Sequence, residues 1–202
     1  MTWQAETPAL LLASASPARA ALLQAAGLRF VARPARIDEA AVKQACRAEG
    51  AEAAETALLL ARLKAGRLRD PAALVIGADQ ILVAGADWFD KPDSPEAARR
   101  QLLMLRGREH ELVTAVVVCR DGEPVWQHVA RPRLLMRRFS DAFLDAYLAA
   151  EGERLTESVG AYRLEGPGVQ LFDRVEGEHA AVLGLPLLAL LGFLRQHGVL
   201  MR

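Results

Sequence analysis

The sequence predicts an α/β fold with a mixed sheet, from two observations. Short apolar runs typical of buried strands alternate with Ala-, Leu- and Arg-rich stretches typical of helices through the first half of the chain. A β-branched segment, residues 112–119, is followed by Asp121-Gly122, a dipeptide typical of hairpin turns. Alternating strands and helices in the first half and a hairpin in the middle together indicate a mixed sheet flanked by helices.

The elements follow from local signals. Strands are expected at residues 9–13, 30–33, 74–77 (continuing extended to 84), 112–119, 125–129, 133–137 and 169–172. The first helix is expected from Pro17 to Ala26, because Ser16 is a good N-cap and Gly27 a good C-terminal stop. Further helices are expected at residues 39–68 with a break near Gly50, at 95–107 with Ser94 as N-cap, at 141–150 with Ser140 as N-cap, and at 186–197.

The composition is that of an ordinary globular protein. The chain has 202 residues, 52% of them hydrophobic, with 25 basic residues against 25 acidic ones. This balance does not favour nucleic acid or an acidic membrane as the partner, and the length suits one domain over residues 1–202 or two tightly packed lobes. The N-terminus lacks the pattern of a signal peptide, and Cys46 and Cys119 are expected as free thiols, so we expect a cytoplasmic protein.

The segment from Ser14 to Arg19 is a candidate anion site. A helix that begins after Ser16 offers unpaired backbone N–H groups and the positive end of its dipole. The hydroxyls of Ser14 and Ser16 and the guanidinium of Arg19 would add donors suited to phosphate oxygens. The alternative is an ordinary capped helix with a surface arginine.

Four charged residues elsewhere are further candidates. Asp79 follows an apolar strand, and a carboxylate at the carboxyl end of such a strand can hold a divalent metal or take a proton from water. Lys64 and Lys91 are two of only three lysines among the 25 basic residues, and each would present a point charge to a phosphate. Glu39 could be a metal or water ligand. Each residue has a non-functional alternative: Asp79 as a turn aspartate, Lys64 and Lys91 as surface lysines, and Glu39 as a carboxylate at a helix start.

A glycine-rich stretch, residues 157–168, is a candidate ligand-binding loop. Gly160, Gly166 and Gly168 allow tight turns beside a ligand, Tyr162 could stack on a base, and Glu165 could accept hydrogen bonds from a purine edge. The alternative is a plain connecting loop. The four histidines show no paired spacing, and no metal ligand is expected among them.

The order of these signals along the chain resembles the Maf family, over residues 10 to about 198. The resemblance is carried by Leu11-Leu12-Ala13-Ser14-Ala15-Ser16-Pro17 with Arg19, Ile37-Asp38-Glu39, Leu63-Lys64-Ala65, Val75 to Gln80, Lys91-Pro92, His110 to Thr114, and Gly184-Leu185-Pro186-Leu187. It implies a fold like that of inosine-triphosphate pyrophosphatases, with an elongated mixed sheet and a cleft between two lobes. It also implies a metal-dependent pyrophosphatase, using Mg²⁺ or Mn²⁺, that cleaves non-standard or selected nucleoside triphosphates to a monophosphate and pyrophosphate. Such proteins are often homodimers.

The resemblance also assigns roles. Asp79 matches the family's proton acceptor, and with Glu39 it is expected to bind the metal. Ser14, Ser16, Arg19, Lys64 and Lys91 match substrate-binding positions. Gln80 and Glu165 match the 7-methyl-GTP branch, whereas the pyrimidine branch typically has threonine and glutamine there.

Two other functions stay open. One is a dTTP/UTP pyrophosphatase, because Ala18 stands where the family usually has a basic or aromatic residue near the specificity site. Asp90 before Lys91 is a second departure, which could weaken the phosphate site or point away from it. The other is a nucleotide-binding regulator of cell division without catalysis, in line with the family's septum-formation label. A metal-competent carboxylate among phosphate-binding cations favours the enzyme.

Overall fold

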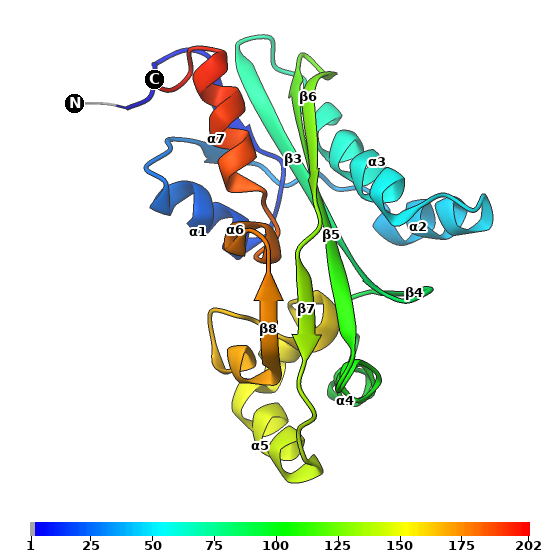
Figure 1. Cartoon of the computed structure of the whole chain (residues 1–202). Coiled ribbons are helices and arrows are strands. Elements are labelled where there is room, and N and C mark those ends of the chain that lie inside the picture. Colours follow the sequence, from blue (N-terminus) through cyan, green and yellow to red (C-terminus); the bar gives the residue numbers. More distant parts are fainter. Residues whose placement is uncertain (1–2) are drawn as a thin grey trace. The chain divides into compact units, whose positions relative to one another are not determined.

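The computed structural model describes residues 3–202 and confirms the α/β class. In this range it has seven α-helices and eight strands, which form one mixed sheet. The strands lie in the order β2 (Val31–Ala32), β1 (Ala9–Leu12), β3 (Ala73–Ala84), β5 (Glu109–Arg120), β7 (Arg133–Met136) and β8 (Phe172–Glu176). Off this path, β4 (Asp87–Phe89) pairs with β3, and β6 (Glu123–Ala130) pairs with β5 (Figure 1). Among these residues, none of the helices has the length and apolarity needed to cross a membrane.

The chain divides into two compact units, each assembled from segments that lie far apart in the sequence. The first comprises the chain through Gln80, Thr114–Ala130 and Leu183–Arg202, and the second Ile81–Val113 and Arg131–Val182. The long strands β3 (Ala73–Ala84) and β5 (Glu109–Arg120) contribute residues to both.

In the first unit, parallel strands form the start of the sheet. Strand β1 (Ala9–Leu12) pairs in parallel with β2 (Val31–Ala32) on one side and with β3 on the other, where Leu12 lies opposite Ile76. Strand β6 (Glu123–Ala130) returns antiparallel along β5 through the predicted Asp121-Gly122 turn. This unit therefore combines parallel and antiparallel pairing.

Helices cover both faces of this part of the sheet. In Figure 1, α1 (Pro17–Ala25) and α7 (Leu187–Gln196) lie on one side of β3, and α3 (Ala53–Gly66) lies on the other. Helix α2 (Glu39–Ala48) precedes α3. Because side chains alternate along a strand, Leu74, Ile76 and Ala78 join the core with α1 and α7, whereas Gly77 and Asp79 face the opposite side.

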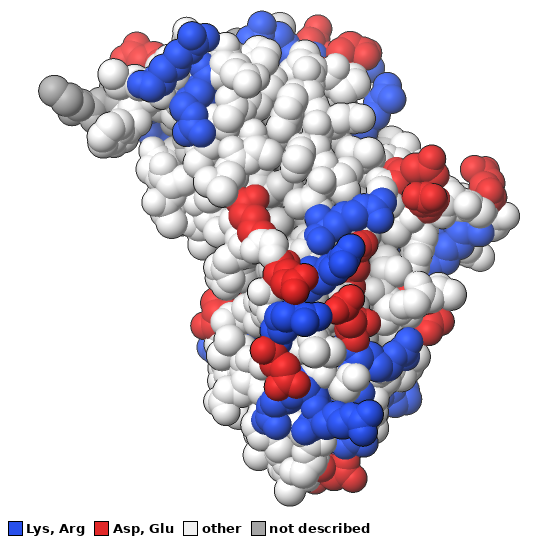
Figure 2. All heavy atoms as spheres, in the orientation of Figure 1, with Lys and Arg blue, Asp and Glu red and all other residues white. Residues whose placement is uncertain are grey.

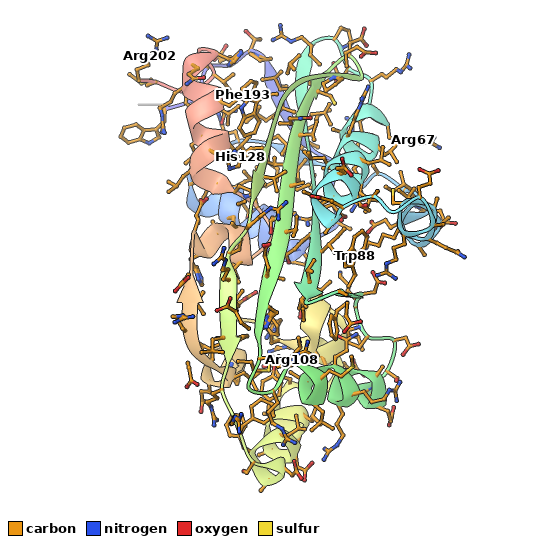
Figure 3. All side chains as sticks on the ribbon, turned by 45° about the vertical axis from the view of Figure 1, so that its right-hand side comes forward. Arg67, Trp88, Arg108, His128, Phe193 and Arg202 are labelled. Carbon is orange, nitrogen blue, oxygen red and sulfur yellow. The ribbon has the colours of Figure 1, made fainter. Side chains whose placement is uncertain are left out.

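The contact between β6 and α7 is aromatic. The Trp126 ring stacks on Phe193, with ring centres 5.0 Å apart, and on His128, with ring centres 6.1 Å apart. Figure 3 labels His128 and Phe193 on the two elements. Phe193 is buried in the core and Trp126 packs against it, so this contact joins β6 to the core of the first unit.

The second unit packs helices and 3-10 turns against short strands. Strand β4 (Asp87–Phe89) forms a hairpin with β3, and β7 (Arg133–Met136) pairs antiparallel with β5 and β8 (Phe172–Glu176). The helices are α4 (Pro95–Leu105), α5 (Asp141–Glu151) and α6 (His179–Val182), and the 3-10 helices are Gly152–Thr156, Val159–Ala161 and Pro167–Leu171.

The exposed face of β7 and β8 is charged with both signs. Arg174 forms ion pairs with Glu109 and Glu176, both at 3.0 Å, and Arg131 lies 3.5 Å from Glu111. Figure 2 shows basic and acidic side chains intermixed over these strands. Because water screens these largely exposed pairs, they stabilise the sheet only modestly.

Most predicted elements are confirmed, including the caps at Ser16, Ser94 and Ser140 and the helix break near Gly50. One strand prediction was wrong. Residues 167–171 form a 3-10 helix, and strand β8 begins at Phe172. The stretch 169–172 is apolar enough for a strand, but Pro167 and Gly168 begin a turn whose Leu171 is buried.

Candidate functional site

The first part of the site is the start of helix α1. The N-cap Ser16 accepts a hydrogen bond through its Oγ from Arg19 N (3.4 Å), and Pro17 occupies the first helical position. Ser14 Oγ accepts hydrogen bonds from Ser16 N and from Arg19 Nη1, both at 3.2 Å. Arg19 Nε donates to the carbonyl of Gly184 at 2.7 Å. The three predicted residues of this segment therefore form one hydrogen-bonded group, in which the two serine hydroxyls accept and Arg19 donates.

The second part is a buried ion-pair cluster. Lys64 Nζ, on α3, lies 2.6 Å from Asp79 Oδ1 on β3 and 2.8 Å from Glu39 Oε1 at the start of α2. The Lys64 and Asp79 side chains are 8% and 5% exposed, whereas that of Glu39 is 47% exposed. The structure thus brings together three residues that are far apart in the sequence.

Gly77 allows this cluster to form. A Cβ at Gly77 would lie 2.2 Å from the carbonyl oxygen of Ala61 and 2.8 Å from the amide nitrogen of Ala65, both in α3. Only a residue without a side chain permits α3 to approach β3 so closely. Lys64 is the neighbour of Ala65, so this contact sets its distance from Asp79.

Opposite charges act on one another across the cluster. Burial lowers the pKa of Arg19, and the negative charges of Asp79 and Glu39 oppose that change. Burial raises the pKa of Glu39, but the ammonium of Lys64, with smaller effects of Lys43 and Arg19, brings it below its usual value. These mutual effects connect the α1 start and the ion-pair cluster as one electrostatic site.

Asp79 also carries an unsatisfied oxygen. Its residue is 3% exposed, and its Oδ2 has no hydrogen-bond partner within residues 3–202. A buried acceptor without a partner costs about 1–3 kcal/mol, and such groups are found at functional sites. Oδ2 is therefore an available acceptor for a water or a ligand for a cation.

The position of Asp79 differs from the prediction. It lies in the interior of the 12-residue strand β3, not at its carboxyl end. The neighbouring strand β1 ends at Leu12, and its parallel pairing with β3 ends at Ile76. Asp79 therefore lies beyond the carboxyl end of the adjacent parallel strand, the place where open α/β sheets bind ligands.

Gln80 and its partner lie next to Asp79. The Gln80 side-chain amide donates to the hydroxyl of Thr114 on β5 at 2.8 Å. Gln80 is partly exposed, whereas Thr114 is fully buried. This bond fixes the orientation of the Gln80 side-chain amide.

The other two predicted residues belong to the second unit. Lys91 and Glu165 are both exposed, Lys91 in the loop before α4 and Glu165 in the turn before the 3-10 helix Pro167–Leu171. Their roles stay predictions.

The predicted stacking of Tyr162 on a base lacks support, because the residue is 5% exposed. Its hydroxyl lies 2.8 Å from His110 Nε2, and its ring packs edge-on against Phe172.

The residues fit a divalent cation that takes its remaining ligands from a substrate. Mg²⁺ is commonly held by one or two carboxylates together with phosphate oxygens and water. Asp79 Oδ2 and the half-exposed Glu39 carboxylate supply such a pair. Within the described range there is no group of three or more His, Cys, Asp or Glu residues that could hold a metal, so the protein alone offers an incomplete coordination shell.

The sequence interpretation missed the supporting residues. Gly184, Thr114 and Gly77 all lie within the segments that resemble the Maf family, but nothing in their residue types indicated a contact with Arg19, Gln80 or α3. Only an alignment of relatives could have marked them, since their partners are between 12 and 165 positions away along the chain.

Comparison with known proteins identifies the family. Residues 9–197 match the model of the family described as Maf-like protein. A protein of Granulibacter bethesdensis named nucleoside triphosphate pyrophosphatase is 58% identical over 95% of this chain and 98% of its own length. One of Rhodospirillum rubrum with the same name is 52% identical, over 96% and 97%. One of Rhizobium meliloti named 7-methyl-GTP pyrophosphatase is 48% identical, over 96% and 98%. The chain belongs to the Maf-like protein family.

Proposed function

We propose that the chain is a nucleoside triphosphate pyrophosphatase, which hydrolyses its substrate to a nucleoside monophosphate and pyrophosphate. The observation that carries this function is Asp79, a buried carboxylate with one oxygen paired to Lys64 and the other without a partner in the described part of the chain. Relatives of 52–58% identity over nearly the whole chain carry the name of that activity.

The cationic groups fit a polyphosphate. The helix start at Ser16 offers backbone N–H groups and the positive end of the α1 dipole. Arg19 offers a planar fork of donors, and Lys64 a point charge. Phosphoryl chemistry depends mostly on positioning and on charge neutralisation, which this set of groups supplies.

Asp79 is the proposed proton acceptor. Lys64 holds Oδ1, which leaves Oδ2 to accept a hydrogen bond from a water molecule. As the water oxygen bonds to the α-phosphorus, Oδ2 takes its proton, and the bond from that phosphorus to the departing pyrophosphate breaks. Arg19 and the helix start stabilise the negative charge that leaves with pyrophosphate.

We further propose that Asp79 and Glu39 hold Mg²⁺ or Mn²⁺ when substrate is bound, with one lone pair of Asp79 Oδ2 directed to the ion and the other to the attacking water. Such an ion would draw negative charge from the phosphate oxygens. Chelation with EDTA should then abolish turnover, and added Mg²⁺ or Mn²⁺ should restore it; full activity in EDTA would contradict metal dependence.

For the base, we propose 7-methyl-GTP as the preferred substrate. Glu165 can accept from both the N1–H and the amino group of guanine, whereas a uracil edge offers one donor. Gln80, held by Thr114, is the second residue typical of that branch. The relative of Rhizobium meliloti carries this substrate in its name, which supports the proposal. A preference for dTTP or UTP would instead favour the pyrimidine alternative.

The decisive experiment measures pyrophosphate release from 7-methyl-GTP, GTP, dTTP, UTP and CTP with Mg²⁺ or Mn²⁺. Asp79→Asn should lower kcat by about 10²- to 10⁴-fold, the usual contribution of a general base, while nucleotide binding persists. Asp87→Asn, the same change at an exposed position on β4, is the matched control and should keep wild-type turnover.

Near-normal turnover of Asp79→Asn would refute its role as proton acceptor. A wild-type protein that binds nucleotides and cleaves none of them would favour the regulator.

A further inference from the structure

The guanidinium of Arg19 is held at two places by other parts of the first unit. Its Nη1 donates to Ser14 Oγ at 3.2 Å, five residues earlier in the chain. Its Nε donates to the Gly184 carbonyl at 2.7 Å, in the segment between α6 and α7, 165 residues away. Two bonds to different nitrogens of one planar group fix both its position and the orientation of its plane.

The Ser14 hydroxyl oxygen is already engaged in hydrogen bonds within the protein. A serine hydroxyl has two acceptor lone pairs and one donor proton. Ser16 N and Arg19 Nη1 both donate to Ser14 Oγ, so both lone pairs are used within the protein. The residue is also buried, at 8% exposure. Ser14 therefore has only its hydroxyl proton left to donate to a phosphate, whereas an arginine side chain has five N–H donors.

Gly184 can present its carbonyl to Arg19 because it has no side chain. Its φ of +100° is a backbone conformation that other residues rarely adopt. A Cβ there would lie 3.3 Å from Arg19 Nε and 3.5 Å from Arg19 Nη2. A larger residue would therefore both strain the loop that directs the carbonyl at Nε and press on the guanidinium.

We infer that Ser14 and Gly184 are positioning residues that preset Arg19 for the phosphates of the substrate, and that Ser14 contributes to binding through Arg19. The inference rests on the proposed function and assigns Ser14 a different role from the direct phosphate contact that the sequence resemblance implies. An arginine free to rotate would lose conformational freedom on binding, and one already held in place loses less, so the two contacts raise affinity.

A double-mutant cycle tests this inference, with inorganic tripolyphosphate as the ligand. Calorimetry measures its dissociation constant for the wild type, Ser14→Ala, Arg19→Ala and the double variant, without added metal. Ser14→Ala should weaken binding about tenfold in the wild-type background, as expected for loss of a hydrogen bond to a charged group. In the Arg19→Ala background it should change the dissociation constant by less than about twofold, because the group it positions is gone.

Further variants separate positioning from general damage. Ser14→Thr keeps the hydroxyl and should restore most of the affinity, and Gly184→Ala should weaken binding only when Arg19 is present. Ser140→Ala, the same change at the cap of α5, is the matched control and should leave tripolyphosphate affinity unchanged. Thermal unfolding of each variant verifies that it is folded.

The outcomes distinguish this inference from the proposed function. Non-additive effects of Ser14→Ala or Gly184→Ala with Arg19→Ala support positioning. Tripolyphosphate binding by the wild type, with effects that simply add, overturns the inference alone. A wild-type protein that neither binds tripolyphosphate nor hydrolyses any nucleotide overturns the proposed function and the inference with it.

Discussion

Replacing Gly77 with alanine should disrupt the site by forcing α3 away from β3. The new Cβ would lie 2.2 Å from the Ala61 carbonyl oxygen, 2.8 Å from Ala65 N and 2.9 Å from Ala65 Cβ. Two of these three atoms are backbone, so no side-chain rotation relieves the clash, and α3 must move away from β3 by about 1 Å to reach ordinary contact distance. Overpacking of this kind destabilises a protein by about 1–3 kcal/mol.

The same movement should reduce activity. Lys64 Nζ lies 2.6 Å from Asp79 Oδ1, and a shift of about 1 Å would take this pair beyond hydrogen-bond distance. Misplacement of a catalytic group by that amount costs on the order of 10²-fold in rate. We therefore expect Gly77→Ala to unfold at lower urea concentration and to hydrolyse nucleotide about 10²-fold more slowly.

Gly192→Ala is the matched control. Gly192 lies inside α7, and a Cβ there would meet nothing within 4 Å. Alanine is the better helix former by about 1 kcal/mol, so this variant should be slightly more stable and fully active. Urea unfolding and pyrophosphate release, measured on both variants, test the predicted losses of stability and activity. If Gly77→Ala unfolds and turns over like the wild type, the close approach of α3 to β3 does not set the geometry of the site.

Three further predictions address charge. Lys64→Met leaves the buried Asp79 carboxylate without its ammonium partner and should lower the free energy of unfolding at pH 7 by about 3–5 kcal/mol. Adding Asp79→Asn should restore part of that stability, and a loss below about 1 kcal/mol for Lys64→Met in urea unfolding would contradict the prediction. Burial lowers the pKa of His110 from 6.5 to about 4, so the unfolded chain binds a proton that the folded protein does not between these values. Stability should therefore fall as the pH drops from 6.5 to 4, by up to about 3 kcal/mol, and His110→Gln, which can still bond to Tyr162, should lose this part of the slope in pH-dependent urea unfolding. Glu165→Gln should lower kcat/KM for 7-methyl-GTP by about 10- to 100-fold and spare dTTP, and equal losses on both nucleotides would argue against base recognition.

Local signals were sufficient for most of the fold. Helix starts at Ser16, Ser94 and Ser140 are decided within four residues, because the cap side chain bonds to a backbone N–H three positions on. The hairpin at Asp121-Gly122 is decided the same way, by two residues with positive φ. The strand at 169–172 was mispredicted because a short segment with three apolar residues in four suits either a strand or a buried turn, and tertiary packing decides between them.

For the site, the chain alone determined which groups are available: a helix start with hydroxyls and an arginine, a carboxylate on an apolar strand, and lysines in a chain that otherwise uses arginine. Only the tertiary structure decided how they meet. Lys64 lies between Asp79 and Glu39 because Gly77 lets α3 approach β3, and Arg19 is fixed by a carbonyl 165 residues away. Such contacts depend on packing between distant segments, which local residue patterns do not encode.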